Sequence, residues 1–247
     1  MRLMLIFIRI PLVILWTAFA ATAGLIACIV RPFSTKNIKV TTNILHYGKY
    51  ILGMKIIIRN REIMDQNRPC VFISNHQDNL DIFAGAFALP KNTVSIGKKD
   101  ILLIPIFGLY YWLSGNILIN RQNKRKAFQA MDIAAKTIRE KKISVWIMPE
   151  GTRSRGKGLL PFKKGPFITA IKAQVPIVPV AWNNYIQDID LNKWHSCTII
   201  LDVLPPMQTT DLKFEDATAM KDEAFRIMSE AVARLDLEVR SGKVIRE

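Results

Sequence analysis

The chain begins with its longest uninterrupted apolar stretch. Residues 10–30 contain no charged side chain, and residues 3–8 extend the stretch beyond a break at Arg9. As an α-helix, residues 10–30 would be about 31 Å long, which matches the roughly 30 Å hydrocarbon core of a bilayer. A cleavable signal peptide is the alternative, but the run is long for one, and Arg31 and Pro32 follow it directly. We therefore expect a membrane-embedded helix.

The next segment, residues 39–52, places apolar side chains at helical spacing and predicts an amphipathic helix. Its apolar face comprises Val40, Ile44, Leu45, Gly48, Ile51 and Leu52. The two helices could form a hairpin in one leaflet, or a transmembrane span followed by an interfacial helix. Basic residues flank both ends of the apolar run, so the positive-inside rule does not fix its orientation.

From residue 54 onward, short apolar and β-branched runs alternate with longer amphipathic ones. The runs that predict strands are residues 54–59, 70–74, 93–97, 116–119, 144–148, 177–182 and 198–203. The segments that predict helices are 80–89, 100–112 with a break at Pro105, 124–140, 166–173 and a last helix from about residue 216. This alternation predicts an α/β fold with a mostly parallel sheet flanked by helices. We expect residues 1–58 to form the membrane part and residues 59–247 the α/β domain.

Charge and cysteine content narrow the possible partners and the compartment. The formal net charge of +15 indicates an anionic partner, such as nucleic acid, an anionic membrane surface, an acidic protein or a phosphorylated ligand. Cys28 lies in the apolar stretch, whereas Cys70 and Cys197 lie in or beside predicted strands. We therefore expect no disulfide framework and a reducing compartment for the main domain. No set of Cys and His residues has zinc spacing, so we predict no metal site.

A candidate general base follows the second predicted strand. Residues 75–81 read Asn-His-Gln-Asp-Asn-Leu-Asp, so Asp81 lies five residues after His76. Residues five apart on one helix are not adjacent, so the pair can meet only if His76 lies in a turn and Asp81 in the first helical turn. Asp78 or Asn79 would then be the N-cap. Asp81 would orient the imidazole, as in a Ser-His-Asp triad.

This pair comes without a nucleophile of its own. Ser74 is nearby, but the chain has no Gly-x-Ser-x-Gly motif. A His-Asp dyad without a nucleophile fits a base that activates a hydroxyl group of the substrate. Taken alone, however, the spacing is more commonly that of an ordinary capped turn, with the carboxylate solvated or paired to a lysine.

Residues that can hold a phosphate group follow other predicted strands. The candidates are Gly151, Thr152 and Arg153 in one turn, Lys98 or Lys99 after residue 97, and Arg121 after residue 120. Glycine allows close approach of the backbone, and arginine can bind phosphate through two hydrogen bonds. Ligands of parallel sheets bind beyond the carboxyl ends of the strands. Glu150 could bond a substrate hydroxyl or pair with Arg121 or Arg153. The basic loop after the predicted strand 144–148 lacks interleaved aromatic residues and a recognisable nucleic-acid-binding module, which disfavours nucleic acid as its ligand.

Four blocks in order resemble the signature blocks of the glycerophospholipid acyltransferases. They are residues 75–81, the Gly-Asn-Ile-Leu-Ile-Asn-Arg of 115–121, the Met-Pro-Glu-Gly-Thr-Arg-Ser of 148–154 and the Val-Pro-Ile-Val-Pro-Val of 175–180. Residues 98–108 resemble the family's segment between the first two blocks, so the resemblance covers about residues 70–182. The chain departs from the pattern at Asn79, Asn120 and Met148, where many members carry an aromatic residue, Asp and Phe.

The resemblance implies an enzyme of phospholipid biosynthesis. Such an enzyme would transfer a fatty acyl group from a thioester to the sn-2 hydroxyl of 1-acyl-sn-glycerol 3-phosphate (lysophosphatidic acid), giving phosphatidic acid. The residues implied are His76 as base, Asp81 as its orienting group, Glu150 for substrate positioning, and Arg153, Thr152, Gly151, Lys98 and Arg121 for the phosphate. No cofactor, metal or acyl-enzyme is implied.

The same resemblance implies the partners and the location. The donor would be an acyl carrier protein thioester or acyl coenzyme A, and the basic surface would suit anionic membrane lipids rather than nucleic acid. The location would be the inner (cytoplasmic) membrane, with the catalytic domain on its cytoplasmic side. Two alternatives stay open: the same chemistry on glycerol 3-phosphate or a lysophospholipid, and a non-catalytic basic membrane-binding protein.

Overall fold

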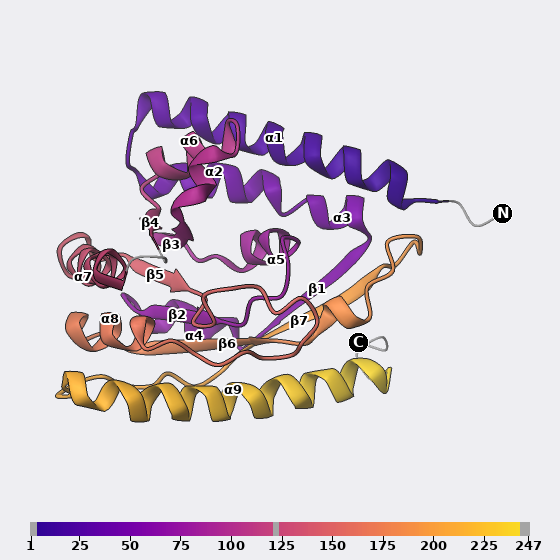
Figure 1. Ribbon diagram of the computed structural model, residues 1–247. Coiled ribbons are helices and arrows are strands. Elements are labelled where there is room, and N and C mark those ends of the chain that lie inside the picture. The colour runs from indigo at the N-terminus through magenta and orange to yellow at the C-terminus, as the bar shows by residue number, and fades with distance from the viewer. Residues whose placement is uncertain (1–3, 121–123, 243–247) are drawn as a thin grey trace.

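A seven-stranded sheet forms the centre of the protein (Figure 1). The computed structural model describes residues 4–120 and 124–242. The strands are β1 (Met54–Arg59), β2 (Val71–Ser74), β3 (Thr93–Lys98), β4 (Ile117–Ile119), β5 (Ser144–Ile147), β6 (Ile177–Trp182) and β7 (Cys197–Val203), in the spatial order β1-β7-β6-β2-β5-β3-β4. Neighbouring strands are parallel except for β6 and β7. The predicted α/β fold with a mostly parallel sheet is confirmed.

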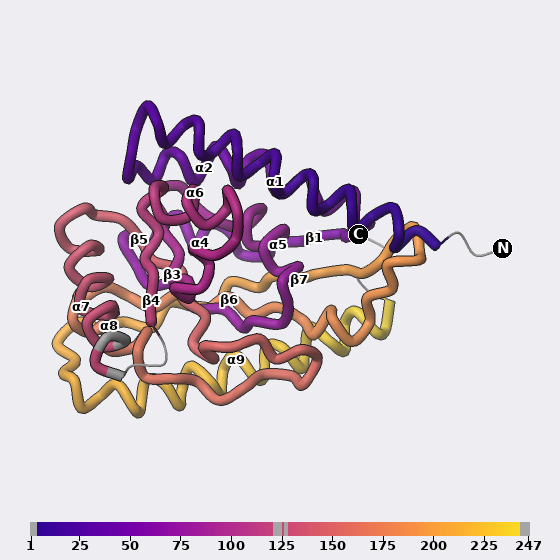
Figure 2. Tube along the Cα trace, turned by 45° about the horizontal axis from the view of Figure 1, so that its top comes forward, coloured from indigo at the N-terminus to yellow at the C-terminus, as the bar shows by residue number. Residues whose placement is uncertain are grey.

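Helices cover both faces of this sheet, as two views of the chain show (Figures 1 and 2). One layer contains α1 (Ile6–Val30), α2 (Thr35–Leu45), α3 (Gly48–Leu52), α5 (Asp81–Ala88) and α6 (Phe107–Leu113). The other contains α7 (Lys124–Lys141), α8 (Gly165–Ala173) and α9 (Ala217–Arg240). The short α4 (Arg61–Gln66) connects β1 to β2, and 3-10 turns lie at Lys99–Leu103, Tyr185–Gln187 and Phe214–Asp216.

The side chains of β2 show how the two faces form separate cores. Successive residues of a strand point to opposite faces, and every residue of β2 is buried. Val71 and Ile73 join the core under α7, α8 and α9, whereas Phe72 joins the core under α1, α3 and α5. Because β2 is buried on both faces, its sequence is continuously apolar rather than alternating.

The first helix includes Arg9, the residue that interrupts the apolar stretch of the sequence. The side chain of Arg9 is buried, and its guanidinium donates hydrogen bonds to the backbone carbonyls of Leu191, Lys193 and Trp194 at 2.8, 2.6 and 2.8 Å. These acceptors replace the water that the charge would otherwise need. The loop before β7 thus satisfies the charge of Arg9 within the helix.

The amphipathic segment is two helices rather than the single helix that its spacing predicts. Helix α2 begins at Thr35, where the hydroxyl of Ser34 accepts a hydrogen bond from the amide of Lys36. A turn at residues 46–47 separates it from α3, which begins at Gly48. A Cβ atom on Gly48 would lie 2.5 Å from the ring of Phe83 in α5. The absence of a side chain at Gly48 thus lets the backbone of α3 approach α5 closely.

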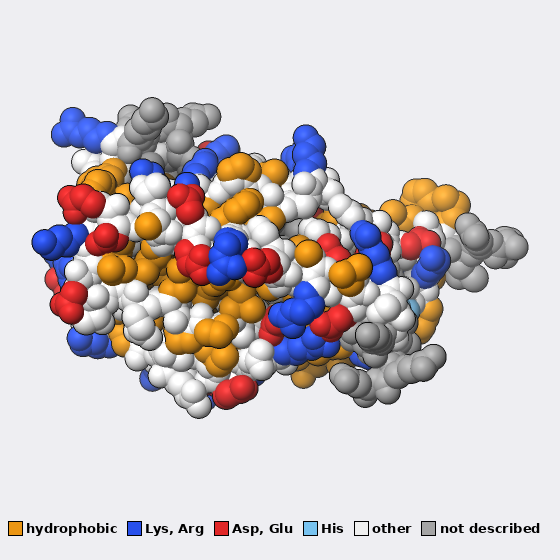
Figure 3. Space-filling model, turned by 90° about the horizontal axis from the view of Figure 1, so that it is seen from below, with side chains coloured by type: hydrophobic (Ala, Val, Ile, Leu, Met, Phe, Trp, Pro, Cys, Tyr) orange, Lys and Arg blue, Asp and Glu red, His pale blue; other side chains and the backbone are white. Residues whose placement is uncertain are grey.

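The outer surfaces of the two helical layers differ in polarity. Many apolar side chains in and near α1 and α6 are more than 45 % exposed, among them Phe7, Leu15, Phe19, Ile29, Leu103 and Trp112. The α9 face instead carries acidic and basic side chains interspersed with apolar ones (Figure 3). Within residues 4–120 and 124–242, α1 is the one helix long and apolar enough to cross a membrane. The exposed apolar surface around α1 indicates that the protein associates with a membrane.

Candidate active site

The candidate site lies where the central strand β2 ends, between the ends of β5 and β6. Asn75 follows β2 directly, and its side chain donates to the carbonyl of Trp182 and accepts from the amide of Trp182, both at 2.9 Å. This pair of hydrogen bonds joins the chain after β2 to the end of β6. The next residue, His76, therefore starts its turn from a fixed point at the carboxyl edge of the sheet.

The predicted contact between His76 and Asp81 is present. The imidazole Nδ1 lies 2.6 Å from Oδ2 of Asp81, with the side chains of His76 and Asp81 18 % and 2 % exposed. His76 lies in the turn after β2, and Asp81 is the first residue of α5. With Nδ1 held by the carboxylate, the other ring nitrogen is left for proton transfer.

Three further donors hold the carboxylate of Asp81. The amides of Gln77 and Asp78 donate to Oδ2 at 2.7 and 3.2 Å, and the hydroxyl of Tyr185 donates to Oδ1 at 2.5 Å. Gln77 is itself anchored, because its side-chain amide donates to the carbonyl of Asn183 at 2.7 Å. The orientation of this buried charge is thus set by groups from the turn and from the segment after β6.

Asp78 has a different local role from the one predicted. Helix α5 begins at Asp81 with Leu80 in the N-cap position, so neither Asp78 nor Asn79 is the cap. The carboxylate of Asp78 instead accepts a hydrogen bond from the amide of Leu80 at 3.2 Å, within the turn that precedes the helix. Such an Asx turn shapes the segment between His76 and Asp81.

Glu150 follows β5 and supports the histidine turn from the other side. Its carboxylate accepts hydrogen bonds from the amides of His76 at 2.6 Å and Leu160 at 3.0 Å. Burial raises the pKa of Glu150 to about 7, against the opposing effect of these two hydrogen bonds. Among the described residues no ion pair joins Glu150 to Arg153, and the alternative partner Arg121 lies outside them.

The loop after β5 lies against the histidine turn. The amide of Ser154 donates to the carbonyl of His76 at 2.8 Å, and the amide of Arg155 donates to the carbonyl of Gln77 at 3.0 Å. Two of the predicted phosphate ligands, Thr152 and Arg153, lie just before these contacts and expose their side chains. The backbone therefore brings the candidate phosphate turn beside the candidate base.

A lysine that sequence reasoning did not single out lies across this turn. Gly151 has a φ of +70°, and a Cβ atom there would lie 2.9 Å from Nζ of Lys163. Glycine thus permits both the left-handed backbone and the close approach of the ammonium group. Lys163 was one of several lysines in a basic loop, and no local spacing connects it with Gly151. We include Lys163 among the candidate phosphate ligands.

Lys98, another predicted phosphate ligand, lies at a neighbouring strand end. Lys98 is the last residue of β3, exposes 46 % of its side chain and forms an ion pair with Asp100. It lies on the same carboxyl edge as His76, with β5 between their strands. Arg121 lies outside the described residues.

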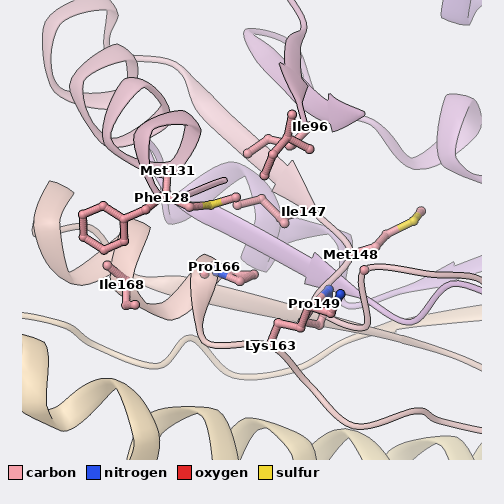
Figure 4. Close-up of a pocket in the computed structure, with 12 residues that line it drawn as sticks. Ile96, Phe128, Met131, Ile147, Met148, Pro149, Lys163, Pro166 and Ile168 are labelled. Carbon is pink, nitrogen blue, oxygen red and sulfur yellow. The ribbon is translucent and has the colours of Figure 1, made fainter. Parts of the chain in front are cut away.

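An apolar cavity of about 430 Å³ opens beside the glycine turn (Figure 4). It lies at the carboxyl ends of β3, β4 and β5 and is lined by Ile96, Ile119, Phe128, Met131, Ile147, Met148, Pro149, Gly151, Lys163, Gly165, Pro166 and Ile168. The lining is apolar except for the ammonium group of Lys163 and the backbone of the turn. A cavity of this kind beside cationic groups can accommodate part of an amphiphilic ligand.

The fold and the four sequence blocks define a class of enzyme. Residues 55–183 match the sequence model of the family described as Acyltransferase, and the chain belongs to that family. It is 34 % identical to the 1-acyl-sn-glycerol-3-phosphate acyltransferase of Salmonella typhimurium over 98 % of this chain and 100 % of that protein. The protein of the same name from Escherichia coli is also 34 % identical over the same shares of both chains.

More distant relatives extend the same similarity. The human 1-acyl-sn-glycerol-3-phosphate acyltransferase alpha is 34 % identical over 92 % of this chain and 81 % of that protein. The crystal structure of the 1-acyl-sn-glycerophosphate (LPA) acyltransferase from Thermotoga maritima superposes with a TM-score of 0.69 at 20 % identity, covering 95 % of this chain and 98 % of that one. At this identity the superposition shows a shared fold.

Proposed function

We propose that the protein transfers a fatty acyl group from a thioester to the sn-2 hydroxyl of 1-acyl-sn-glycerol 3-phosphate, forming phosphatidic acid. The buried His76–Asp81 pair carries the proposal, in a chain related along its whole length to proteins named for this acceptor. Among the described hydrogen bonds, none joins the ring of His76 to a serine, threonine or cysteine side chain, which favours direct attack by the hydroxyl of the acceptor.

The reaction needs one proton to move twice. Nε2 of His76 removes the proton of the sn-2 hydroxyl while that oxygen forms a bond to the thioester carbonyl carbon. Asp81 accepts the Nδ1 hydrogen bond and stabilises the imidazolium that forms. When the tetrahedral intermediate collapses, the C–S bond breaks, and the imidazolium returns its proton to the leaving thiolate. The products are the ester and a free thiol, with the histidine restored.

The phosphate of the acceptor would bind beside this base. Arg153 provides a guanidinium that can form two hydrogen bonds, and Thr152 adds a hydroxyl. We place Gly151 and Lys163 at the same turn because of their close approach, with Lys98 on the same edge and Arg121 as a further cation proposed from the sequence. Glu150 holds the backbone of His76 and would thereby position the base against the substrate.

The donor and the membrane follow from charge and surface. An acyl carrier protein and coenzyme A are both anionic, and the net charge of +15 favours either. The exposed apolar residues around α1 would hold the protein in a bilayer that contains anionic lipids. We place the protein at the inner (cytoplasmic) membrane with its α/β domain on the cytoplasmic side, where both thioesters are made.

An acyltransferase assay in mixed micelles or vesicles tests the proposal. Lysophosphatidic acid, glycerol 3-phosphate and lysophosphatidylcholine would each be offered with acyl carrier protein thioester and with acyl coenzyme A. We expect phosphatidic acid from lysophosphatidic acid, and far less product from the other acceptors. Faster turnover of another acceptor would replace the substrate while keeping the chemistry, and thioester hydrolysis without acyl transfer would contradict the proposed reaction.

Substitution of the base is the matching test of mechanism. His76→Ala should reduce kcat by about 10²–10⁴-fold, the usual contribution of a general base. His195→Ala is the control, because His195 is exposed and its Nε2 contacts only the hydroxyl of Thr198 among the described contacts. Turnover by His76→Ala at the rate of the His195→Ala variant would show that His76 is not the base.

A further inference from the structure

Tyr185 approaches the dyad from outside the four blocks and from outside the matched residues 55–183. It starts the 3-10 turn after β6, and its side chain is fully buried. Its hydroxyl donates to Oδ1 of Asp81 at 2.5 Å, whereas Nδ1 of His76 and two backbone amides use Oδ2. Among the described contacts, Tyr185 is therefore the one donor to the second carboxylate oxygen.

The position of Tyr185 is in turn fixed by the last helix. Asp236 in α9 accepts two hydrogen bonds from Asn184, at 2.6 Å from its backbone amide and at 2.7 Å from its side-chain amide. The preceding residue, Asn183, bonds the backbone of Thr198 and Ile200 in β7. The backbone on the N-terminal side of Tyr185 is thus tied to both α9 and β7.

We propose that Tyr185 is a positioning residue of the His76–Asp81 dyad, and that Asp236 of α9 acts through it. The inference rests on the proposed function, since it assigns Tyr185 to the base of that reaction. Without a donor on Oδ1, only the donors on Oδ2 restrain the carboxylate, so its χ2 torsion is less restricted and Oδ2 faces Nδ1 in a less fixed geometry. A misoriented imidazole lowers kcat more than it affects binding of the acceptor.

The groups around the dyad keep Tyr185 a hydrogen-bond donor. The titratable groups that face Asp81 and Tyr185 are His76 and Asp78 of the turn, Glu150 after β5 and Cys197 of β7. Burial and the neighbouring Asp81 raise the pKa of Tyr185 well above its ordinary value, so the phenol stays a donor.

Tyr185→Phe is the direct test because it removes the hydroxyl and keeps the ring. We expect kcat to fall about tenfold and the KM of the acceptor to change less than threefold. Tyr111→Phe is the control: it also removes a phenolic hydroxyl, bonded to Ser95 at 2.8 Å, on another part of the sheet. A wild-type kcat in Tyr185→Phe, or an equal loss of kcat in Tyr111→Phe, would overturn the assignment.

The contribution of α9 is tested separately. Asp236→Ala should lower kcat less than Tyr185→Phe does, and the double variant should resemble Tyr185→Phe alone, because Asp236 acts through the same hydroxyl. Glu238→Ala is the control on the same helix, since Glu238 pairs with Arg59 and Arg234 instead. Strictly additive losses in the double variant would contradict the connection between Asp236 and Tyr185.

His76→Ala in the same assay separates the two proposals. If His76→Ala keeps its turnover, the dyad is not the base, and the proposed mechanism and the role of Tyr185 both fail. If His76→Ala is inactive while Tyr185→Phe keeps the kcat and KM of wild type, only the role of Tyr185 fails.

Discussion

Two turns lie side by side at the carboxyl edge of the sheet, after the neighbouring strands β2 and β5. In the first, Asn75, Gln77 and Asp81 are at most 2 % exposed, and their side chains all form hydrogen bonds. In the second, Thr152 and Arg153 expose their side chains to solvent. Proton transfer needs reacting atoms in a fixed geometry, whereas a long, mobile cation can still reach an anion. The protein therefore makes the turn that carries the base rigid and leaves the phosphate turn adaptable.

The largest effect should come from the rigid turn. Asp81→Ala should lower kcat by about 10²–10⁴-fold with a small change in KM, because the imidazole loses the group that orients it. Steady-state kinetics with varied acceptor would separate the two parameters. Asp81→Asn keeps the side-chain volume and should lose rate as well, which guards against a folding defect. A kcat within threefold of wild type in both variants would contradict the distinction between the turns.

The exposed turn should respond mainly in binding. Arg153→Ala should raise the KM of the phosphorylated acceptor about tenfold or more and leave kcat within a few-fold, because hydrogen bonds to a charged partner are worth about 1.5–3 kcal/mol. The same kinetic series would measure it. Lys157→Ala removes one positive charge from the same exposed loop and is the matched control. A loss confined to kcat would show that Arg153 acts in the chemical step, like the turn that carries His76, rather than in binding of the acceptor.

Glu150 contacts both turns, and its contribution to stability should depend on pH. Its pKa is about 7 in the folded protein against an ordinary value of 4.5, so between these values the native state binds more protons than the unfolded state. The contribution of Glu150 to stability is therefore complete below about pH 4.5 and is lost as the pH rises through 7. We expect Tm of wild type to fall relative to Glu150→Gln across this window. Parallel Tm curves for the two proteins would contradict this linkage.

The smallest effect should come from Gly151, whose backbone lies close to the ammonium group of Lys163. Gly151→Ala places a Cβ atom 2.9 Å from the ammonium nitrogen at a φ of +70°, so we expect a loss of about 1 kcal/mol in stability and a modest rise in acceptor KM. Gly158→Ala is the control, because Gly158 has a φ of +75° but no atom within 4 Å of the new Cβ. Equal KM values in the two variants would show that Lys163 does not depend on this turn.

Local patterns in the sequence predicted much of the fold and one half of the site. Apolar runs alternate with amphipathic ones along the chain, so the strands and most helices followed from periodicity alone. The five-residue gap between His76 and Asp81 also required a turn followed by a helix, which the structure contains. Both inferences depend only on residues close in sequence.

Features that depend on distant residues could not be predicted in this way. Tyr185 reaches Asp81 across 104 residues, and no periodicity marks a buried phenol as the partner of a carboxylate. The reversed direction of β7 differs, because it could have been inferred from the connection before it. A parallel connection usually contains a crossover helix, whereas between β6 and β7 the structure has only a short 3-10 turn and loop.

The buried Arg9 has a consequence for how the protein is made. Its three carbonyl partners follow it by 182, 184 and 185 residues, so they do not exist when the first helix leaves the ribosome. Arg9 is the fourth residue of α1, and a long cationic side chain near the end of a membrane helix can extend toward water until those partners are present. This end of α1 therefore reaches its final contacts only after the segment before β7 has been synthesised.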